Sequence, residues 1–337
     1  MNLTDPKYAS IALVQEMLET PEIMRNFDYD QTKEIAEIVK SAGRPFFTGE
    51  GSSRIFPAKS TMACALRKGM DVAMATAGSF EAAEYDLSKW AIFAASNSGQ
   101  TKEVVSLYKN LRAAGHERRF AVTANHGTLL EASANRTIVL ACGKEKAVAA
   151  TKSVVEQGVV YHSVLRNIRG CKNCHLKDAA DMAAEVLSAE YDPEIIAKIA
   201  ASPMMYFAGR NNGVAEELRL KTNEITRKKS DYLEGTYLLH GIEEVMNAGE
   251  TIILIEPFAS ECARIKELLV DGIGVNVVAI STQDTVFPTI KIPSAGSAEA
   301  YLQLLAGWNV LVQTGIALGI DLDKPARARK IGNEFVG

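Results

Sequence analysis

The sequence is short of the features that mark membrane, secreted and nucleic-acid-binding proteins. Its 337 residues contain no run of about 20 apolar residues, so no transmembrane helix is expected. The stretch Met1–Pro6 lacks the basic and apolar regions of a signal peptide, and none is expected. The 37 basic residues are outnumbered by 41 acidic ones, and no basic tract is present. We therefore expect neither nucleic acid nor a membrane as a partner.

Cysteine is scarce. Five cysteines in a chain that needs no covalent staples indicate a reducing cytoplasm. The stretch Cys171–His175 has the CxxCH spacing of c-type haem attachment, but neither export nor a second axial ligand is signalled. Zinc would need a second Cys or His pair, which does not follow. We interpret Cys171 and Cys174 as reduced thiols in a polar connector and expect no metal.

Nucleotide-binding motifs are also missing. The turn Gly49-Glu50-Gly51 lacks the third glycine of GxGxxG, and no acidic residue closes the next strand for a ribose contact. There is no GxxxxGK[ST] sequence either. No cofactor is therefore expected.

What the chain does contain is a repeated alternation of short apolar runs and longer amphipathic stretches. This βαβ rhythm predicts parallel sheets covered on both faces, and the length suggests two domains. The first set of strands is expected at Pro45–Thr48, Val72–Thr76, Ala91–Ala95, Phe120–Thr123 and Thr137–Leu140. The second set is expected at Met204–Ala208, Thr251–Ile255, Val275–Ile280 and Thr289–Ile292, with helices at Lys102–Ala114, Gly213–Lys228 and Ala298–Leu318.

The expected organisation is linear. Each α/β domain opens with a strand, a glycine-containing turn and a helix, which suggests duplication of one fold. The predicted segments are a helical stretch 1–34, a first domain 35–168, a connector 169–192, a second domain 193–325 and a tail 326–337.

Two polar turns follow expected strands and predict an anion site. Ser96-Asn97-Ser98-Gly99-Gln100-Thr101 follows Ala91–Ala95 and precedes a helix, where free N–H groups and the helix dipole attract anions. Gly51-Ser52-Ser53 repeats this logic after the first strand. The alternative for the first turn is a Ser-rich helix cap without a ligand.

Charged residues with helical spacing form a third candidate. Glu217, Lys221 and Glu224 are spaced i, i+4 and i+7 and share one helix face. Such a stripe is commonly a solvated, salt-bridged surface, and the alternative is catalysis.

His240 ends an apolar run at a glycine turn and can move protons near neutral pH, whereas His162 is expected in a helical core.

Taken in chain order, these residues resemble the sugar isomerase (SIS) domain family in tandem arrangement. The resemblance is strongest to the isomerase half of glucosamine-6-phosphate synthase and its stand-alone deaminase relatives, and it covers nearly the whole chain. It rests on Gly51–Ser53, the SxSGxT loop Ser96–Thr101, the E-x-x-V-A-x-T-K segment Glu145–Lys152, the Glu217, Lys221 and Glu224 triad, His240-Gly241, the D-x-D-x-P segment Asp321–Pro325, and Lys330.

The resemblance implies two tandem SIS domains, each a parallel sheet flanked by helices in a flavodoxin-like arrangement. It also implies a sugar-phosphate site that needs no metal, with Val148 and Ala150 closing over the sugar. The phosphate-binding residues would be Gly51, Ser52, Ser53, Ser96, Asn97, Ser98 and Thr101.

The resemblance further assigns catalytic roles. Glu224 would move a proton between C1 and C2 through an enediol or enolamine, and Lys221 would stabilise the developing oxyanion. Lys330 would form a Schiff base or polarise the anomeric oxygen. His240 would assist ring opening across a dimer interface, so a cytoplasmic homodimer with a shared active site is expected.

Three departures from the family pattern leave the substrate open: Ile242 replaces the usual proline, Tyr237 replaces a usual glutamate, and Asn223 stands where the synthase has a second lysine. The expected activity is phosphosugar aldose–ketose isomerisation, with deamination of an amino-sugar phosphate. One alternative is a fructosamine-phosphate deglycase, or an isomerase of another anionic sugar such as a sulfonate. The alternative from another class is a non-catalytic sugar-phosphate-binding regulator.

Overall fold

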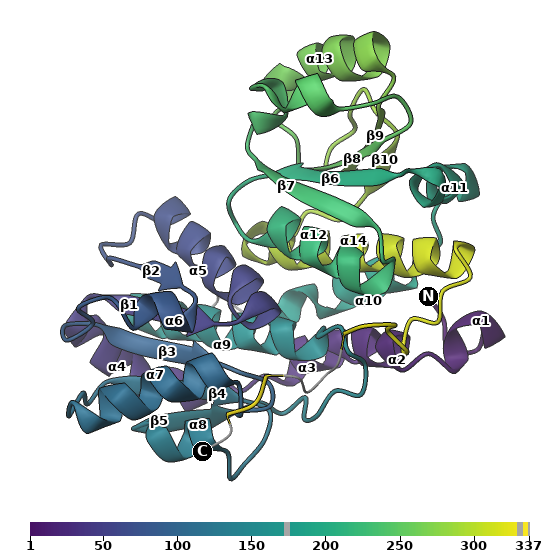
Figure 1. Ribbon diagram of the computed structural model, residues 1–337. Coiled ribbons are helices and arrows are strands. Elements are labelled where there is room, and N and C mark those ends of the chain that lie inside the picture. Colours follow the sequence, from purple (N-terminus) through teal and green to yellow (C-terminus); the bar gives the residue numbers. More distant parts are fainter. Residues whose placement is uncertain (172–175, 329–332, 336–337) are drawn as a thin grey trace. The chain divides into compact units, whose positions relative to one another are not determined.

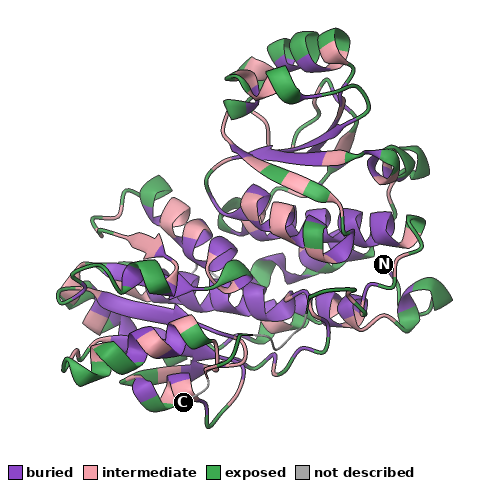
Figure 2. Ribbon diagram, viewed as in Figure 1, coloured by how far each residue is buried: buried purple, intermediate pink, exposed green. Residues whose placement is uncertain are grey.

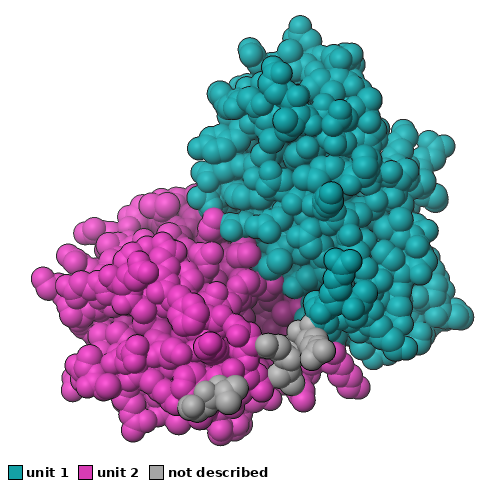
Figure 3. Space-filling model, in the orientation of Figure 1, with its two compact units in different colours: residues 1–18, 147–149, 181–328 teal, residues 19–146, 150–180, 329–337 magenta. Residues whose placement is uncertain are grey.

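The computed structural model describes residues 1–171, 176–328 and 333–335. The chain forms two compact units (Figure 3). Unit 1 comprises residues 1–18, 147–149 and 181–328, and unit 2 comprises residues 19–146, 150–180 and 329–337. Each unit contains one five-stranded parallel sheet flanked by helices (Figure 1), which confirms the expected α/β class. The linear domain boundaries stay a prediction.

The sheet of unit 2 has the strand order β2-β1-β3-β4-β5. Its central strands are fully buried because helices cover both faces (Figure 2). The strands are β1 (Pro45–Gly49), β2 (Ala75–Ala77), β3 (Ala91–Ala95), β4 (Arg119–Thr123) and β5 (Arg136–Val139). The helices are α3 (Thr20–Asn26), α4 (Lys33–Ala42), α5 (Ile55–Arg67), α6 (Ser79–Ala82), α7 (Lys102–Ala113), α8 (Leu129–Ser133) and α9 (Lys152–Arg169), with short 3-10 turns η1 (Tyr29–Thr32), η2 (Gly51–Ser53) and η3 (Leu176–Ala179).

Alternation along the strands divides the apolar side chains between the two faces. Phe46 packs in the cluster beneath α6, α7 and α8. Its neighbour Phe47 points to the other face, where its ring centroid lies 4.7 Å from that of Tyr161 on α9 and 5.5 Å from that of Phe93. Both faces of the sheet are therefore core, as the continuous apolar runs predicted.

The sheet of unit 1 has the order β10-β9-β8-β6-β7, which repeats the strand succession of unit 2. Its strands are β6 (Met204–Gly209), β7 (Lys229–Glu234), β8 (Thr251–Ile255), β9 (Asn276–Ser281) and β10 (Thr289–Lys291). Its helices are α1 (Pro6–Ala9), α2 (Ala12–Leu18), α10 (Ala180–Ser188), α11 (Pro193–Ala201), α12 (Val214–Ile225), α13 (Cys262–Ile265), the π-helix η7 (Lys266–Ile273) and α14 (Glu299–Ala317), with 3-10 turns η4 (Tyr237–Leu239), η5 (Ile242–Val245), η6 (Ala259–Glu261) and η8 (Gly296–Ala298).

Helices α12 and α14 pack closely on one face of this sheet. A Cβ atom added at Gly307 of α14 would lie 2.4 Å from the Leu218 side chain of α12, so only glycine permits the observed approach. Helix α13 and η7 cover the opposite face with Ile265 and Leu269.

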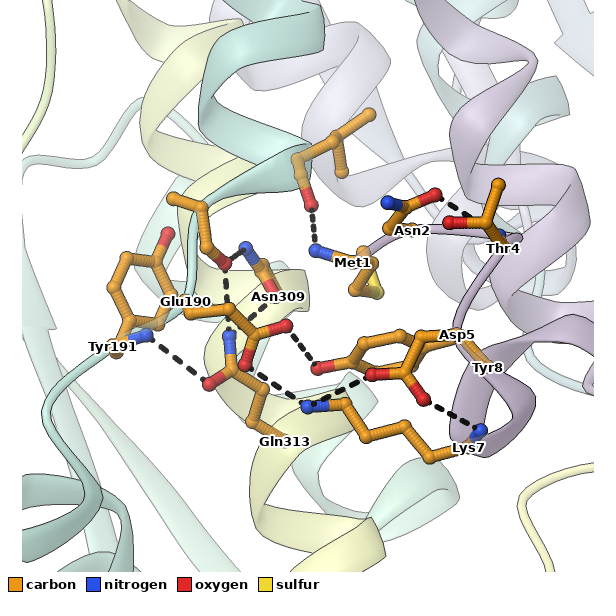
Figure 4. Close-up of polar contacts among 12 residues, drawn as sticks. Met1, Asn2, Thr4, Asp5, Lys7, Tyr8, Glu190, Tyr191, Asn309 and Gln313 are labelled. Carbon is orange, nitrogen blue, oxygen red and sulfur yellow. Dashed lines mark hydrogen bonds and ion pairs between the residues drawn. The ribbon is translucent and has the colours of Figure 1, made fainter.

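The N-terminal residues are fixed within unit 1 by polar contacts with α10 and the chain that follows it, which in turn contact α14 (Figure 4). The amino group of Met1 donates to the Leu187 carbonyl at 2.8 Å. The Tyr8 hydroxyl donates to Glu190 at 2.8 Å, and the Asn309 amide donates to the Val186 carbonyl at 3.0 Å. These contacts help to place the N-terminal residues in the same compact unit as α10 and α14.

Most expected elements are confirmed, since nine of the observed strands coincide with or overlap expected ones. The exception is β7, which begins directly after the helix expected at Gly213–Lys228 and for which the sequence analysis predicted no element. Residues Lys229–Glu234 are largely polar because β7 is an edge strand with exposed positions, so the apolar signal of a buried strand is absent.

The reading of reduced thiols is wrong for Cys171, which is disulfide-bonded, while Cys64, Cys142 and Cys262 are free. Cys174 lies outside the described residues. Within residues 1–171, 176–328 and 333–335, none of the helices combines the length and apolar character needed to cross a bilayer.

His162 is a core residue of α9, as expected. Burial lowers its pKa from 6.5 to about 4, because desolvation disfavours the charged imidazolium. The unfolded chain therefore binds more protons than the folded chain between these two pKa values. The neutral imidazole stabilises the fold above about pH 6.5, and this contribution is lost as the pH falls toward 4.

We predict that the free energy of unfolding of the wild type falls by about 2–3 kcal/mol more than that of His162→Gln between about pH 7 and pH 4.5. Urea unfolding at both pH values measures the difference. His126→Gln, at an exposed histidine, is the control and should follow the wild type. Parallel curves for wild type and His162→Gln would contradict the assignment.

Candidate functional site

The loop Ser96–Thr101 links the end of β3 to the start of α7 and closes on itself through hydroxyl groups. The Ser96 hydroxyl lies 2.8 Å from that of Thr101 and accepts from the Gly99 amide at 3.0 Å. The Ser98 hydroxyl accepts from the Gln100 amide at 3.1 Å. The loop thus gathers three hydroxyl groups before the N-terminus of a 12-residue helix, whose dipole favours an anion.

Gly99 sets the shape of this loop. Its φ of +63° lies in the left-handed region, which side chains disfavour. A Cβ atom here would also lie 2.5 Å from the side chain of Thr128, the residue that caps α8. Both the backbone angle and the packing therefore require glycine.

The second predicted turn, Gly51–Ser53, starts beside this loop. Strands β1 and β3 are parallel neighbours, with Gly49 opposite Ala95, so the chain leaves both strands at one sheet edge roughly 5 Å apart. The strand order reverses between β1 and β3, and ligands of open α/β sheets bind at such a point. Ser52 is buried, and the Ser53 hydroxyl accepts from Gln157 of α9 at 3.4 Å.

Glu145 is a residue of this site that the sequence analysis quoted only as the start of a motif. Its side chain is buried, and its carboxylate accepts from the Thr151 amide at 2.8 Å and from the Ser153 amide and hydroxyl at 3.2 and 2.8 Å. The amide of Asn97 also donates to it at 3.3 Å. Glu145 therefore connects the start of α9 to the loop Ser96–Thr101, which we call the anion loop.

Val148 and Ala150 lie between these anchored positions and are both half-buried. Whether they contact a sugar stays a prediction.

The buried carboxylate of Glu16 accepts from the Ala147 amide at 3.3 Å and fixes Ala147 within unit 1. A helix start leaves amide donors without intrahelical acceptors, and a carboxylate in the segment before α9 was the available signal for Glu145.

The charged stripe of α12 is not a solvated surface, which corrects the alternative weighed from spacing. The side chains of Glu217 and Lys221 are fully buried, and that of Glu224 is 26% exposed. The Lys221 ammonium lies 2.6 Å from the Glu224 carboxylate and 3.5 Å from that of Glu217. The stripe is covered because α14 and β7 both pack on α12, a tertiary effect that spacing does not encode.

A buried ammonium between two carboxylates is costly to desolvate and survives only when paired. We call this cluster the α12 triad (Glu217, Lys221, Glu224). Of the three side chains, that of Glu224 alone is partly exposed.

His240 is exposed and lies in the turn between η4 and η5 of unit 1. Thr236 is its nearest hydroxyl, at 3.5 Å from Nε2, and the Tyr237 ring stands edge-on at 6.4 Å. This turn follows β7 at the sheet edge where α12 begins, whereas Glu224 lies ten residues further along α12, about 15 Å down the helix. The structure of one chain does not bring His240 and Glu224 together.

The remaining predicted residues are distributed as follows. Lys330 lies outside the described residues. The anion-loop residues belong to unit 2, and the α12 triad and His240 belong to unit 1. Among the described residues, no group of three or more His, Cys, Asp and Glu side chains is placed to hold a metal ion.

In the sheet of unit 1, the strand end that corresponds to the end of β3 is occupied by the carboxylate of Glu256. Glu256 follows β8 as Ser96 follows β3, with a φ of +46°. Its carboxylate accepts from the Ser281 hydroxyl at 3.1 Å and from the amide and hydroxyl of Thr282, each at 2.9 Å. The Glu256 carboxylate thus occupies the strand end in unit 1 that corresponds to the Ser96–Thr101 loop of unit 2.

Solved structures share this fold over nearly the whole chain. The tagatose-6-phosphate ketose/aldose isomerase of Escherichia coli superposes with a TM-score of 0.77 at 15% identity, covering 96% of this chain and 98% of that one. The glucosamine-6-phosphate deaminase of Thermotoga maritima gives 0.74 at 19% identity, covering 96% and 98%. The chain has the fold of the phosphosugar isomerases.

Sequence similarity points the same way, although no protein-family model matches the chain. The glutamine–fructose-6-phosphate aminotransferase (isomerizing) of Bacillus subtilis strain 168 is 25% identical over 351 residues, which cover 94% of this chain and 57% of that protein. The chain therefore spans a little over half the length of the curated relatives it matches. Fold and sequence both support the sugar isomerase resemblance that the motifs carry.

We predict that Glu145→Ala weakens binding of inorganic phosphate on the order of tenfold, because its donors in the anion loop and α9 lose their charged acceptor. Glu145→Gln keeps one acceptor oxygen and should lose less. Titration calorimetry measures the affinities, and Glu117→Ala, at an exposed carboxylate of the same unit, is the control. A folded Glu145→Ala protein with wild-type phosphate affinity would refute this role.

Proposed function

We propose that the chain is a phosphosugar aldose–ketose isomerase that acts on an amino-sugar phosphate with deamination. The observation that carries the proposal is the buried α12 triad, which presents the single carboxylate of Glu224. Fully burying Lys221 and Glu217 is costly, and a regulator that only binds a sugar phosphate has no use for such a cluster. The proposed architecture is a tandem pair of flavodoxin-like SIS domains in a cytoplasmic homodimer.

In this proposal the anion loop of unit 2 binds the sugar phosphate. The hydroxyls of Ser96, Ser98 and Thr101 and the N-terminal turn of α7 supply donors, and no metal is required. Asn97 is held by Glu145, and Gly51, Ser52 and Ser53 line the neighbouring strand end. Val148 and Ala150 would then pack over the sugar.

Glu224 is the proposed base. It removes the proton from C2 of the open-chain amino sugar, and the electron pair moves through C1 to the aldehyde oxygen, giving an enolamine. Return of the proton to C1 gives a C2 imine. Water adds to this imine and ammonia leaves, which yields the ketose phosphate.

The geometry supports a role for Lys221 toward Glu224 more directly than toward substrate. Its side chain has no exposed surface and its ammonium lies 2.6 Å from the Glu224 carboxylate, so the ion pair holds this carboxylate in place. Stabilisation of the developing oxyanion by Lys221 stays a prediction, as does the contact of Lys330 with the open sugar.

Ring opening is assigned to His240 of the partner subunit. Within one chain the turn that carries the histidine and Glu224 lie at opposite ends of α12, so a site that uses both needs two copies of the chain. The expected assembly is a two-fold dimer with two shared sites.

We predict that Glu224→Gln and His240→Ala are each inactive in releasing ammonia from glucosamine 6-phosphate, and that mixing them restores activity. Random exchange makes half of the dimers mixed, and each mixed dimer has one intact site of two, which gives about a quarter of wild-type activity. The two proteins are denatured together, refolded and assayed for ammonia.

The controls are Glu267→Gln and His126→Ala, at exposed positions away from the triad and the His240 turn, which should retain full activity. Ammonia release by Glu224→Gln alone would remove the proposed base. Two inactive variants that do not recover on mixing would exclude the shared site while leaving Glu224 in its role.

A further inference from the structure

A short segment near the end of the chain pairs with the anion loop. The Lys102 amide donates to the Asn333 carbonyl at 3.0 Å, and the Phe335 amide donates to the Gln100 carbonyl at 2.9 Å. Thr101 and Glu334 form the antiparallel bridge between these two hydrogen bonds. Residues 333–335, which we call the tail segment, thus form a one-bridge ribbon with residues 100–102 inside unit 2.

Phe335 anchors the tail segment. Its half-buried ring packs against the apolar cluster that α7 shares with the sheet, and the Lys109 ammonium lies 3.8 Å from the ring centroid. The Asn333 side chain donates to Glu103 in the first turn of α7. Asn333 and Glu334 are exposed, so Phe335 is the one half-buried residue of the tail segment.

The tail segment touches the functional end of the loop. Thr101, at the bridge, also places its hydroxyl 2.8 Å from that of Ser96, so pairing at Thr101 fixes a hydroxyl of the anion site. Lys102 contributes the first amide of α7, one of the donors that a helix start leaves without an intrahelical acceptor. With this amide bonded to Asn333, the loop is held in a single backbone orientation.

We propose that Phe335 is a positioning residue for the anion loop, and that docking of the tail segment and anion binding stabilise each other. The proposal rests on the phosphate-binding role proposed above for this loop. Because coupling between two binding events is reciprocal, undocking the tail segment weakens anion binding, and a bound anion holds the tail segment in place.

The test uses the full chain, inorganic phosphate as the probe and three variants. Phe335→Ala should bind phosphate more weakly, on the order of tenfold, and its Gln100–Lys102 amides should exchange hydrogen faster. Phe335→Tyr keeps the ring and should restore both. Phe80→Ala removes an aromatic ring of unit 2 that is 55% exposed and should change neither.

In the wild type, phosphate should slow hydrogen exchange at the Phe335 amide, which a purely structural contact would not do. Phe335→Ala with wild-type phosphate affinity and faster loop exchange would overturn the proposal, because docking would then have no bearing on the anion site. Phosphate binding that leaves exchange at Phe335 unchanged would also overturn it. A wild-type protein that does not bind phosphate would instead disprove the anion site and the inference together.

Discussion

The parallel pairing of β1 with β3 is the constraint on which the proposed anion site depends. With Gly49 opposite Ala95, the chain leaves both strands at one sheet edge, and the two polar turns start side by side. The remaining contacts hold the loop in shape: Gly99 against Thr128, Glu145 on Asn97 and the start of α9, and Phe335 on the far end. The hydroxyls are thereby fixed before any ligand arrives, which reduces the entropic cost of binding.

The α12 triad shows the complementary use of burial. A lysine and two glutamates on one face of an exposed helix would contribute little, because solvent screens surface ion pairs. Burial removes that screening and leaves Glu224 as the one partly exposed side chain of the triad. Unit 1 also closes its own sheet edge with Glu256, so two sheets of one topology hold different parts of the proposed chemistry.

The sequence predicted the elements whose signal is local. Buried strands such as Thr251–Ile255 are continuous apolar runs, and the polar turn after Ala91–Ala95 stands out beside them. What could not be predicted depends on contacts between distant residues. The edge strand β7 lacks an apolar pattern, the burial of Lys221 follows from coverage by α14, and the pairing of Phe335 with Gln100 joins positions far apart in the chain.

The central claim is that this chain moves a proton between C1 and C2 of a sugar held by its phosphate. Proton NMR in deuterated water tests it most directly, with wild-type protein and either glucosamine 6-phosphate or glucosamine. The account predicts deuterium at C1 or C2, with ammonia release, for the phosphorylated sugar and none for the free sugar. Binding of glucosamine 6-phosphate without exchange at either carbon would contradict it.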